Sequence, residues 1–269
     1  MELLTRANTK TLKGQRRGFV TYILHLAPAK LSGYEVCGGR SPECTVLCLN
    51  SAGRGQFTLT QEARIRRTKW FFEYRDSFMV QLVKEISTAI RYGMKHNLQV
   101  CIRLNGTSDI PWESIRCGCF SNIMERYPFI QFYDYTKLLG RKNLPANYHL
   151  TFSLSETNQA QAKQAMTQGM NLAVVFDEIP SMWQGMPVIS GDEDDLRFLD
   201  PSGYIIGLKA KGKAIKSQSI FVQRTIHEPR TNGRVARITG RRHSNSSQSR
   251  SSSIPRQRPP NNQSHSRIA

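Results

Sequence analysis

Short apolar runs recur along the chain, and polar residues follow each of them. The runs are rich in β-branched and aromatic residues, which is typical of strands. From Thr60 onward the pattern changes, and Met79, Leu82, Ile86 and Ile90 recur at helical spacing up to about Gly93. The stretch 157–169 is also compatible with a helix. The six predicted strands cover residues 18–29, 98–104, 129–132, 148–152, 171–176 and 204–208.

Strands that alternate with helices are typical of parallel βαβ units, and nearly continuous apolar strands fit a sheet covered on both faces. The sequence therefore predicts an α/β fold, an open or partial (β/α)6 barrel of mostly parallel strands with a disordered basic C-terminal tail. We expect residues 1–17 to be an irregular basic lead-in and 18–226 a single barrel-like domain. Residues 227–269 are rich in Arg, Ser and Pro and carry too little apolar surface to fold, so they should be disordered.

Positive charge extends over the whole chain. The formal net charge is +18; residues 228–269 hold nine arginines and one acid, which is +8, and leave +10 for residues 1–227. Basic proteins attract anions, nucleic acid above all, although a positive surface can also serve solubility alone. The sequence predicts a nucleic-acid partner, and leaves the oligomeric state open.

The chain contains no run of eighteen apolar residues, so we expect no membrane span. The first ten residues, M-E-L-L-T-R-A-N-T-K, hold no long apolar run, which predicts a cytoplasmic protein without a signal peptide. In that reducing compartment, cysteines more often bind metals or act in catalysis than form disulfides.

Three of the six cysteines gather in one short segment. Cys37, Cys44 and Cys48 are spaced C-x6-C-x3-C, among glycines that let the backbone wrap closely around a ligand. Three neighbouring thiolates suit a metal ion or an iron–sulfur cluster and leave one coordination position open. The alternative is that these cysteines are merely packed.

Polar residues follow several predicted strands directly. The active sites of parallel α/β barrels are built from the loops at the carboxyl ends of the strands, although polar loops are common for other reasons. We expect Asp134, Lys137 and Glu156 to be catalytic, with Tyr133 and Tyr135 able to join a proton relay. The predicted cofactor-binding residues are Arg103, Asn105, Asp109 and Ser153.

A strand followed by a cysteine-rich loop, then alternating helices and strands, resembles the radical SAM enzymes. That resemblance implies a [4Fe–4S] cluster on Cys37, Cys44 and Cys48, whose fourth iron binds S-adenosylmethionine. It also implies that Asn105, Asp109 and Glu156 meet ribose or amino groups and that Arg103 meets a carboxylate. The spacing departs from the common C-x3-C-x2-C pattern of those enzymes.

The segments G-Y-E-V-C-G-G-R-S-P-E-C-T-V-L-C-L-N-S-A-G-R-G, R-L-N-G-T-S-D-I, F-Y-D-Y-T-K, Y-H-L-T-F-S and G-D-E-D-D-L-R-F with G-L-K-A-K-G-K resemble the gene product 88 family of phages and plasmids. The resemblance spans residues 33–214 and implies a mobile-element origin and a bacterial host cell.

The leading hypothesis is a radical SAM-like enzyme that acts on nucleic acid or a nucleotide. One alternative is a non-catalytic nucleic-acid-binding protein with a structural zinc on the three cysteines and a histidine such as His25 or His149. Another is a nuclease that uses a metal ion on Asp192, Asp194 and Asp195. The sequence contains no P-loop, no G-x-G-x-x-G fingerprint and no G-x-S-x-G elbow.

Overall fold

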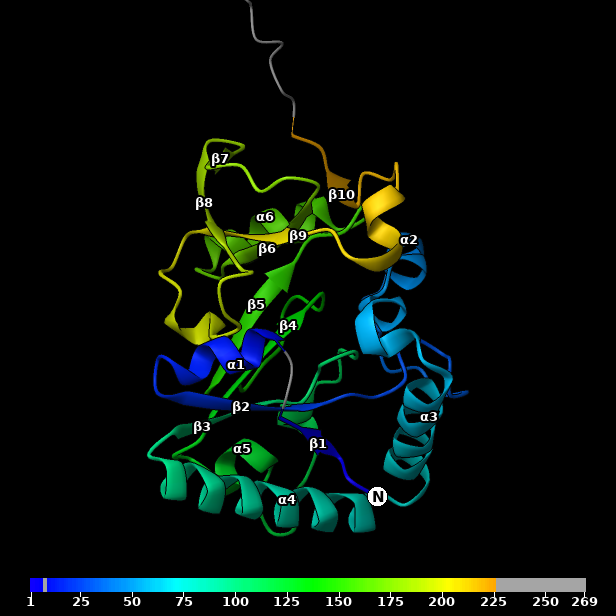
Figure 1. Ribbon diagram of the computed structural model, residues 1–269, viewed down its shortest axis with the longest axis vertical. Helices are drawn as coiled ribbons and strands as arrows, with labels where there is room; N and C mark the ends of the chain where they lie inside the picture. The colour runs from blue at the N-terminus through cyan, green and yellow to red at the C-terminus, as the bar shows by residue number, and fades with distance from the viewer. Residues whose placement is uncertain (7–8, 226–269) are drawn as a thin grey trace, which may run out of the picture. The chain divides into compact units, whose positions relative to one another are not determined.

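The computed structural model describes residues 1–6 and 9–225. The tail at 227–269, predicted to be disordered, lies outside the described residues. Within them, ten strands form one open sheet, in the order β1-β2-β3-β4-β5-β6-β9-β8-β7, with β10 beside β6 (Figure 1). The strands are β1 (Leu4–Thr5), β2 (Phe19–Leu24), β3 (Gln99–Arg103), β4 (Gln131–Thr136), β5 (Tyr148–Ser153), β6 (Leu172–Phe176), β7 (Met182–Trp183), β8 (Met186–Ser190), β9 (Ile205–Lys209) and β10 (Val222–Gln223).

The six predicted strands are β2, β3, β4, β5, β6 and β9, and they lie side by side in chain order. Every pairing among them is parallel, while β1 and β7 pair antiparallel with their neighbours. The predicted α/β fold with a mostly parallel, open sheet is therefore confirmed. Because parallel strands in sequence order bring their carboxyl ends to one edge, the loops after β2, β3, β4 and β5 all begin there.

The helices are unevenly distributed among the connections. The loop of residues 137–147 between β4 and β5 contains no helix, whereas two long helices precede β3. The helices are α1 (Thr9–Gln15), α2 (Pro42–Val46), α3 (Thr58–Glu73), α4 (Arg75–His96), α5 (Ile123–Arg126) and α6 (Gln159–Thr167).

The single helix expected from Thr60 to Gly93 is in fact α3 and α4. The chain leaves helical geometry at Tyr74, and the rings of Phe71 and Phe78 on either side of this break pack 5.3 Å apart in the core. Helix α4 continues past Gly93 and ends where Asn97 adopts a left-handed conformation with φ 52°. Gly93 instead permits the approach of β3, because a Cβ there would lie 2.6 Å from Val100 Cγ2.

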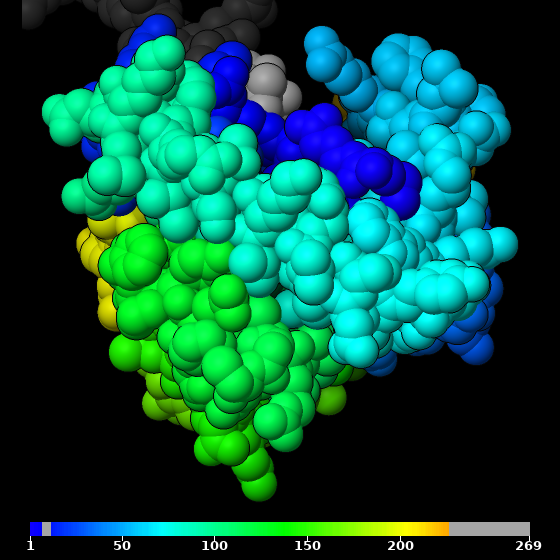
Figure 2. Space-filling model, turned by 90° about the horizontal axis from the view of Figure 1, so that it is seen from below, coloured from blue at the N-terminus to red at the C-terminus, as the bar shows by residue number. Residues whose placement is uncertain are grey.

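The N-terminal residues contribute to the fold. Strand β1 and helix α1 occupy the segment expected to be irregular, and the Glu85 carboxylate of α4 accepts from the backbone N–H groups of Leu3 and Leu4, at 2.9 and 2.7 Å. The first residues of the chain, dark blue in Figure 2, lie beside α3 and α4. The elements of residues 1–17 are too short to show a periodicity in the sequence, and tertiary contacts order them.

The main core lies between the sheet and helices α3 and α4. It includes Phe71, Phe78 and Leu82 from the helices and Ile102 and Phe132 from the sheet. Since successive strand residues point to opposite faces, Tyr133 lies on the other face, where its ring contacts Phe198 at 5.3 Å between centroids. The segment 191–200 therefore covers that second face.

Candidate functional site at the carboxyl edge of the sheet

The three clustered cysteines lie on one short folded segment, residues 37–55, which we call the cysteine segment. Cys37 precedes helix α2, Cys44 lies within it, and Cys48 follows it. Ser41 caps α2 by accepting from Cys44 N at 3.2 Å, and the Cys48 sulfur accepts from Asn50 N at 3.5 Å. These local bonds, made by Ser41 and Cys48 themselves, fold the segment back upon itself.

All three cysteines are free thiols and half-buried. The pKa of Cys37 is raised to about 12, chiefly by burial and in smaller part by the nearby Cys48 and Cys44. Burial also raises the pKa of Cys48, while Arg64 and Lys137 lower it. The three sulfur atoms are thus close enough to affect one another, although no three His, Cys, Asp or Glu side chains in residues 1–6 and 9–225 are arranged to hold a metal ion.

Glu156, which follows β5, anchors the cysteine segment. Its carboxylate accepts from Ser41 Oγ at 2.7 Å and from Glu43 N at 3.0 Å. Because both donors lie at the start of α2, Glu156 stabilises the amino end of that helix. It therefore positions the segment that carries the thiols.

Asp109 links two other strand ends to the same region. Its carboxylate accepts from Thr136 Oγ1 at 2.8 Å and from Lys137 N at 2.7 Å, and its backbone N–H donates to Val36 O at 2.8 Å. Asp109 thus holds the end of β4 against the chain just before Cys37.

Lys137 points toward β5 from the end of β4. Its Nζ donates to Ser153 Oγ at 2.6 Å. The charge of Lys137 lowers the pKa of the Cys48 thiol, and Gly39 packs against the Lys137 backbone. Lys137, Ser153 and Glu156, all expected to belong to a site, therefore adjoin the cysteine segment.

Asp134 and Asn105 lie elsewhere. Asp134 is fully buried and accepts from Tyr148 Oη at 3.0 Å and from Asn105 N at 2.9 Å. The Asn105 side chain accepts from Trp112 Nε1 at 3.2 Å within the core under the helices. Their contacts hold together the ends of β3 and β4 and do not include the thiols.

Arg103 is engaged on the second face of the sheet. It donates from Nη1 to Asp195 at 2.7 Å, and its guanidinium lies 5.1 Å from the centre of the Tyr135 ring. Arg103 thus fastens the segment 191–200 to the sheet.

The three aspartates considered as ligands of a nuclease metal ion are likewise paired with cationic side chains. Asp192 binds Lys211 at 2.5 Å, Asp194 binds Arg17 at 2.7 Å, and Asp195 binds Arg103. The carboxylates meet different partners and do not gather around one point.

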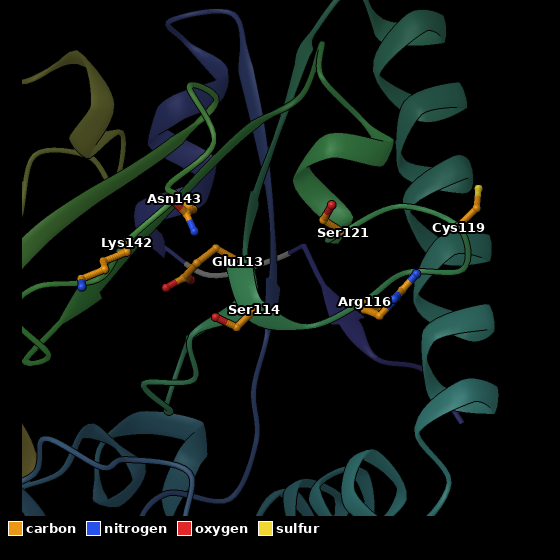
Figure 3. A pocket seen from close by; sticks show the side chains of 7 residues that line it. All are labelled: Glu113, Ser114, Arg116, Cys119, Ser121, Lys142 and Asn143. Carbon is orange, nitrogen blue, oxygen red and sulfur yellow. The ribbon is translucent and has the colours of Figure 1, made fainter.

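Two surface pockets can be compared with this site. One, of about 530 Å³, adjoins the cysteine segment and is lined by Glu35, Cys37, Gly38, Arg40, Pro42, Thr45 and Val46. The other, of about 340 Å³, is shown in Figure 3; there Lys142 and Asn143 lie on one side of Glu113, and Arg116 and Cys119 on the other. The Glu113 carboxylate of this second pocket is already paired with Arg141.

Residues missed by the sequence analysis complete the site. Arg64 of α3 donates from Nη1 to Asn50 Oδ1. His25, considered only as a zinc ligand, follows β2, and its Nδ1 is buried without a hydrogen-bond partner. The signal for Arg64 was its spacing, because Arg64, Thr68 and Phe71 recur at helical intervals on the buried face of α3.

Comparison with known proteins identifies one family. The family model described as gene product 88 matches residues 2–224, a longer stretch than the resemblance over 33–214. The chain matches no curated protein and no solved structure. Among the described residues, no helix combines the length and apolar character needed to cross a membrane.

Proposed function

The chain belongs to the gene product 88 family, and we propose that it is an enzyme with an iron–sulfur centre on Cys37, Cys44 and Cys48. One observation carries this proposal. The ends of β4 and β5 contact the cysteine segment through Lys137 and Glu156, and Asp109, in the loop after β3, binds the backbone of Val36 just before it. Parallel α/β enzymes place their chemistry at such an edge.

The number and type of the donors suit a cluster of this kind, although binding would have to bring together sulfur atoms that are not arranged for a metal ion in the described residues. Three cysteines within twelve residues are free and half-buried, and three thiolates on a four-iron cluster leave one iron open. When bound, a [4Fe–4S] cluster would supply an electron to S-adenosylmethionine held at the open iron. Since burial keeps the Cys37 thiol protonated, metal binding should release a proton, and the segment must draw its sulfur atoms together.

The order of the strands supports the radical SAM-like interpretation. Six parallel strands follow one another in the sheet, and the cysteine segment comes after the first of them. On this basis we propose that the sheet is a partial (β/α)6 barrel. Lys137 and Ser153 would then bind the cofactor or substrate, while Glu156 and Asp109 position the loops.

Charge favours an anionic substrate, nucleic acid or a nucleotide. Residues 1–227 alone carry +10, by subtracting the +8 of residues 228–269 from +18. A reducing compartment such as the bacterial cytoplasm would keep the thiols free for a metal.

Metal and sulfide analysis of protein purified without oxygen tests the proposal. We expect about four irons and four sulfides per chain, lost together in the variant Cys37→Ala/Cys44→Ala/Cys48→Ala. The matched control is Cys119→Ala, because Cys119 is exposed and outside the cysteine segment. Cleavage of S-adenosylmethionine by the reduced protein is then measured directly.

Two results would overturn the proposal. One zinc per chain would favour a nucleic-acid-binding protein with a structural metal, and a filter-binding assay at two salt concentrations would test that alternative. No metal at all would leave the cysteine segment with a purely structural role.

A further inference from the structure

Arg64 is a buried cation without a carboxylate partner. Its side chain lies on α3 and the residue is 7% exposed. In the part of the chain that the structure describes, Arg64 forms no ion pair with an acid, and its Nε is buried without a hydrogen-bond partner. Burying an uncompensated charge is costly, so an anion is expected near this guanidinium.

The other deeply buried arginines are compensated. Arg103 pairs with Asp195 at 2.7 Å, Arg141 pairs with Glu113, and Arg197 pairs with Asp200 at 3.2 Å. Arg64 differs from all three in having only the neutral amide of Asn50 as acceptor. The protein thus neutralises its structural arginines and leaves this one open to a further partner.

The surroundings of Arg64 hold its guanidinium in place. Asn50 is 8% exposed and accepts from Nη1. A Cβ on Gly55 would lie 3.2 Å from Nη1 and 2.7 Å from Asn50 O, so the glycine permits this close approach. A fixed guanidinium recognises a planar or tetrahedral oxyanion better than a mobile one does.

The open guanidinium belongs to the candidate site. Arg64 lies close enough to Cys48 to lower the pKa of its thiol, as Lys137 does. Arg64 also affects His25. The pKa of His25 is lowered to about 3, mainly by burial and in smaller part by nearby arginines that include Arg64. A neutral His25 with an unpartnered Nδ1 can donate to a ligand or accept from one.

We propose that Arg64 binds an oxyanion, the carboxylate or phosphate of a ligand that enters beside the three cysteines. Lys137 supplies a second positive charge in the same region, and among the described residues its Nζ donates to a hydroxyl rather than to an acid. The inference rests on the proposed function for the identity of the site, and adds the charge class of the ligand. It requires no particular metal.

Titration calorimetry on the full-length protein tests the inference, with inorganic pyrophosphate as the phosphate probe and L-methionine as the carboxylate probe. We expect the wild type to bind one of the two, and Arg64→Met to bind it at least ten-fold more weakly. Arg64→Lys keeps the charge but not the fork, and should lie between them. The matched control is Arg66→Met, since Arg66 is 60% exposed on the same helix and should leave the affinity unchanged.

The same samples separate this inference from the proposed function. Iron in the wild type together with unchanged anion binding by Arg64→Met would overturn the oxyanion site alone. If the protein contains no metal and its anion binding requires Arg64, the oxyanion site would be supported and the iron–sulfur cluster proposal would be overturned. A wild type that binds neither probe would overturn the inference; if Arg64→Met does not fold, Arg64→Lys must show at least a three-fold loss.

Discussion

Ser41 Oγ donates to Glu156 Oε2 at 2.7 Å, so a residue of the cysteine segment is held by one that follows β5, 115 positions later. Glu156 also accepts from Glu43 N at 3.0 Å. The Glu156 carboxylate therefore accepts from the side chain of Ser41, which caps α2, and from the backbone N–H of Glu43 in the first turn of that helix. A residue expected to be catalytic has contacts that position the thiols.

Replacing Glu156 should loosen the cysteine segment. Glu156→Ala removes both acceptors and should lower the free energy of unfolding by about 1–3 kcal/mol. Glu156→Gln keeps an acceptor oxygen and should lose less. Urea denaturation gives the stability, and the alkylation rate of Cys44 reports the local loosening. Thr157→Ala, at the exposed neighbouring position, is the control; equal alkylation rates in all variants would contradict this role of Glu156.

Two adjacent glycines should differ sharply in their tolerance of a side chain. A Cβ on Gly39 would lie 3.0 Å from the Lys137 carbonyl carbon, whereas one on Gly38 would meet nothing nearer than Leu138 Cδ2 at 3.9 Å. Gly39→Ala should therefore cost about 1–3 kcal/mol and displace the cysteine segment from Lys137. Gly38→Ala should be nearly neutral. Thermal unfolding of both variants tests this, and equal melting temperatures would show that the segment does not pack on β4 in this way.

The ion pairs of the segment 191–200 should be far more important than those on the surface. Arg197 is 2% exposed and pairs with Asp194 and Asp200. Arg197→Met leaves Asp200 without its ion-pair partner and Asp194 with Arg17 alone, and should cost about 3–5 kcal/mol. Arg224→Met breaks the exposed pair with Asp177 and should cost at most about 1 kcal/mol. Denaturation midpoints compare the two, and a small effect at Arg197 would mean that water replaces the lost cation.

The apolar runs were enough to predict the central strands, because each of these strands contains within its own residues the apolar run that its burial requires. Val20, Ile102, Phe132 and Val174 all lie within such runs and are fully buried. Strands of two residues, such as β1 and β7, carry no pattern of their own and form where a neighbouring strand offers free backbone groups. Pairing, not periodicity, creates them.

The candidate site was predictable only in part. The polar residues after the strands could be placed at one edge, which is where Lys137 and Glu156 lie. The partners of the polar residues that follow the strands could not be predicted, because they come from distant parts of the chain. Arg103, for example, binds Asp195, which lies in a loop 92 residues later. Arg64 was missed because a charged helical residue is normally exposed, and its burial depends on the folded cysteine segment.

Stability should fall as the pH rises through the range set by Asp134. Burial raises the pKa of Asp134 to about 7, whereas the unfolded chain ionises this carboxyl near pH ~3.9. Between these values the native protein binds more protons than the unfolded chain, so the contribution is fully present below pH ~4 and is lost by about pH 7. Asp134→Asn removes this group, and its free energy of unfolding should vary less steeply with pH, by roughly 1–4 kcal/mol over the window.

Urea denaturation at several pH values between 4.5 and 7.5 measures the slope for Asp134→Asn and the wild type. Asp200, whose pKa is raised to about 6 by burial, contributes in the same direction, so the variant should keep part of the dependence. Asp76→Asn changes an exposed side chain of the same kind on α4 and is the control. Equal slopes in wild type and Asp134→Asn would mean that the carboxylate is ionised in the native protein, held by Tyr148 and the backbone N–H groups of Leu104 and Asn105.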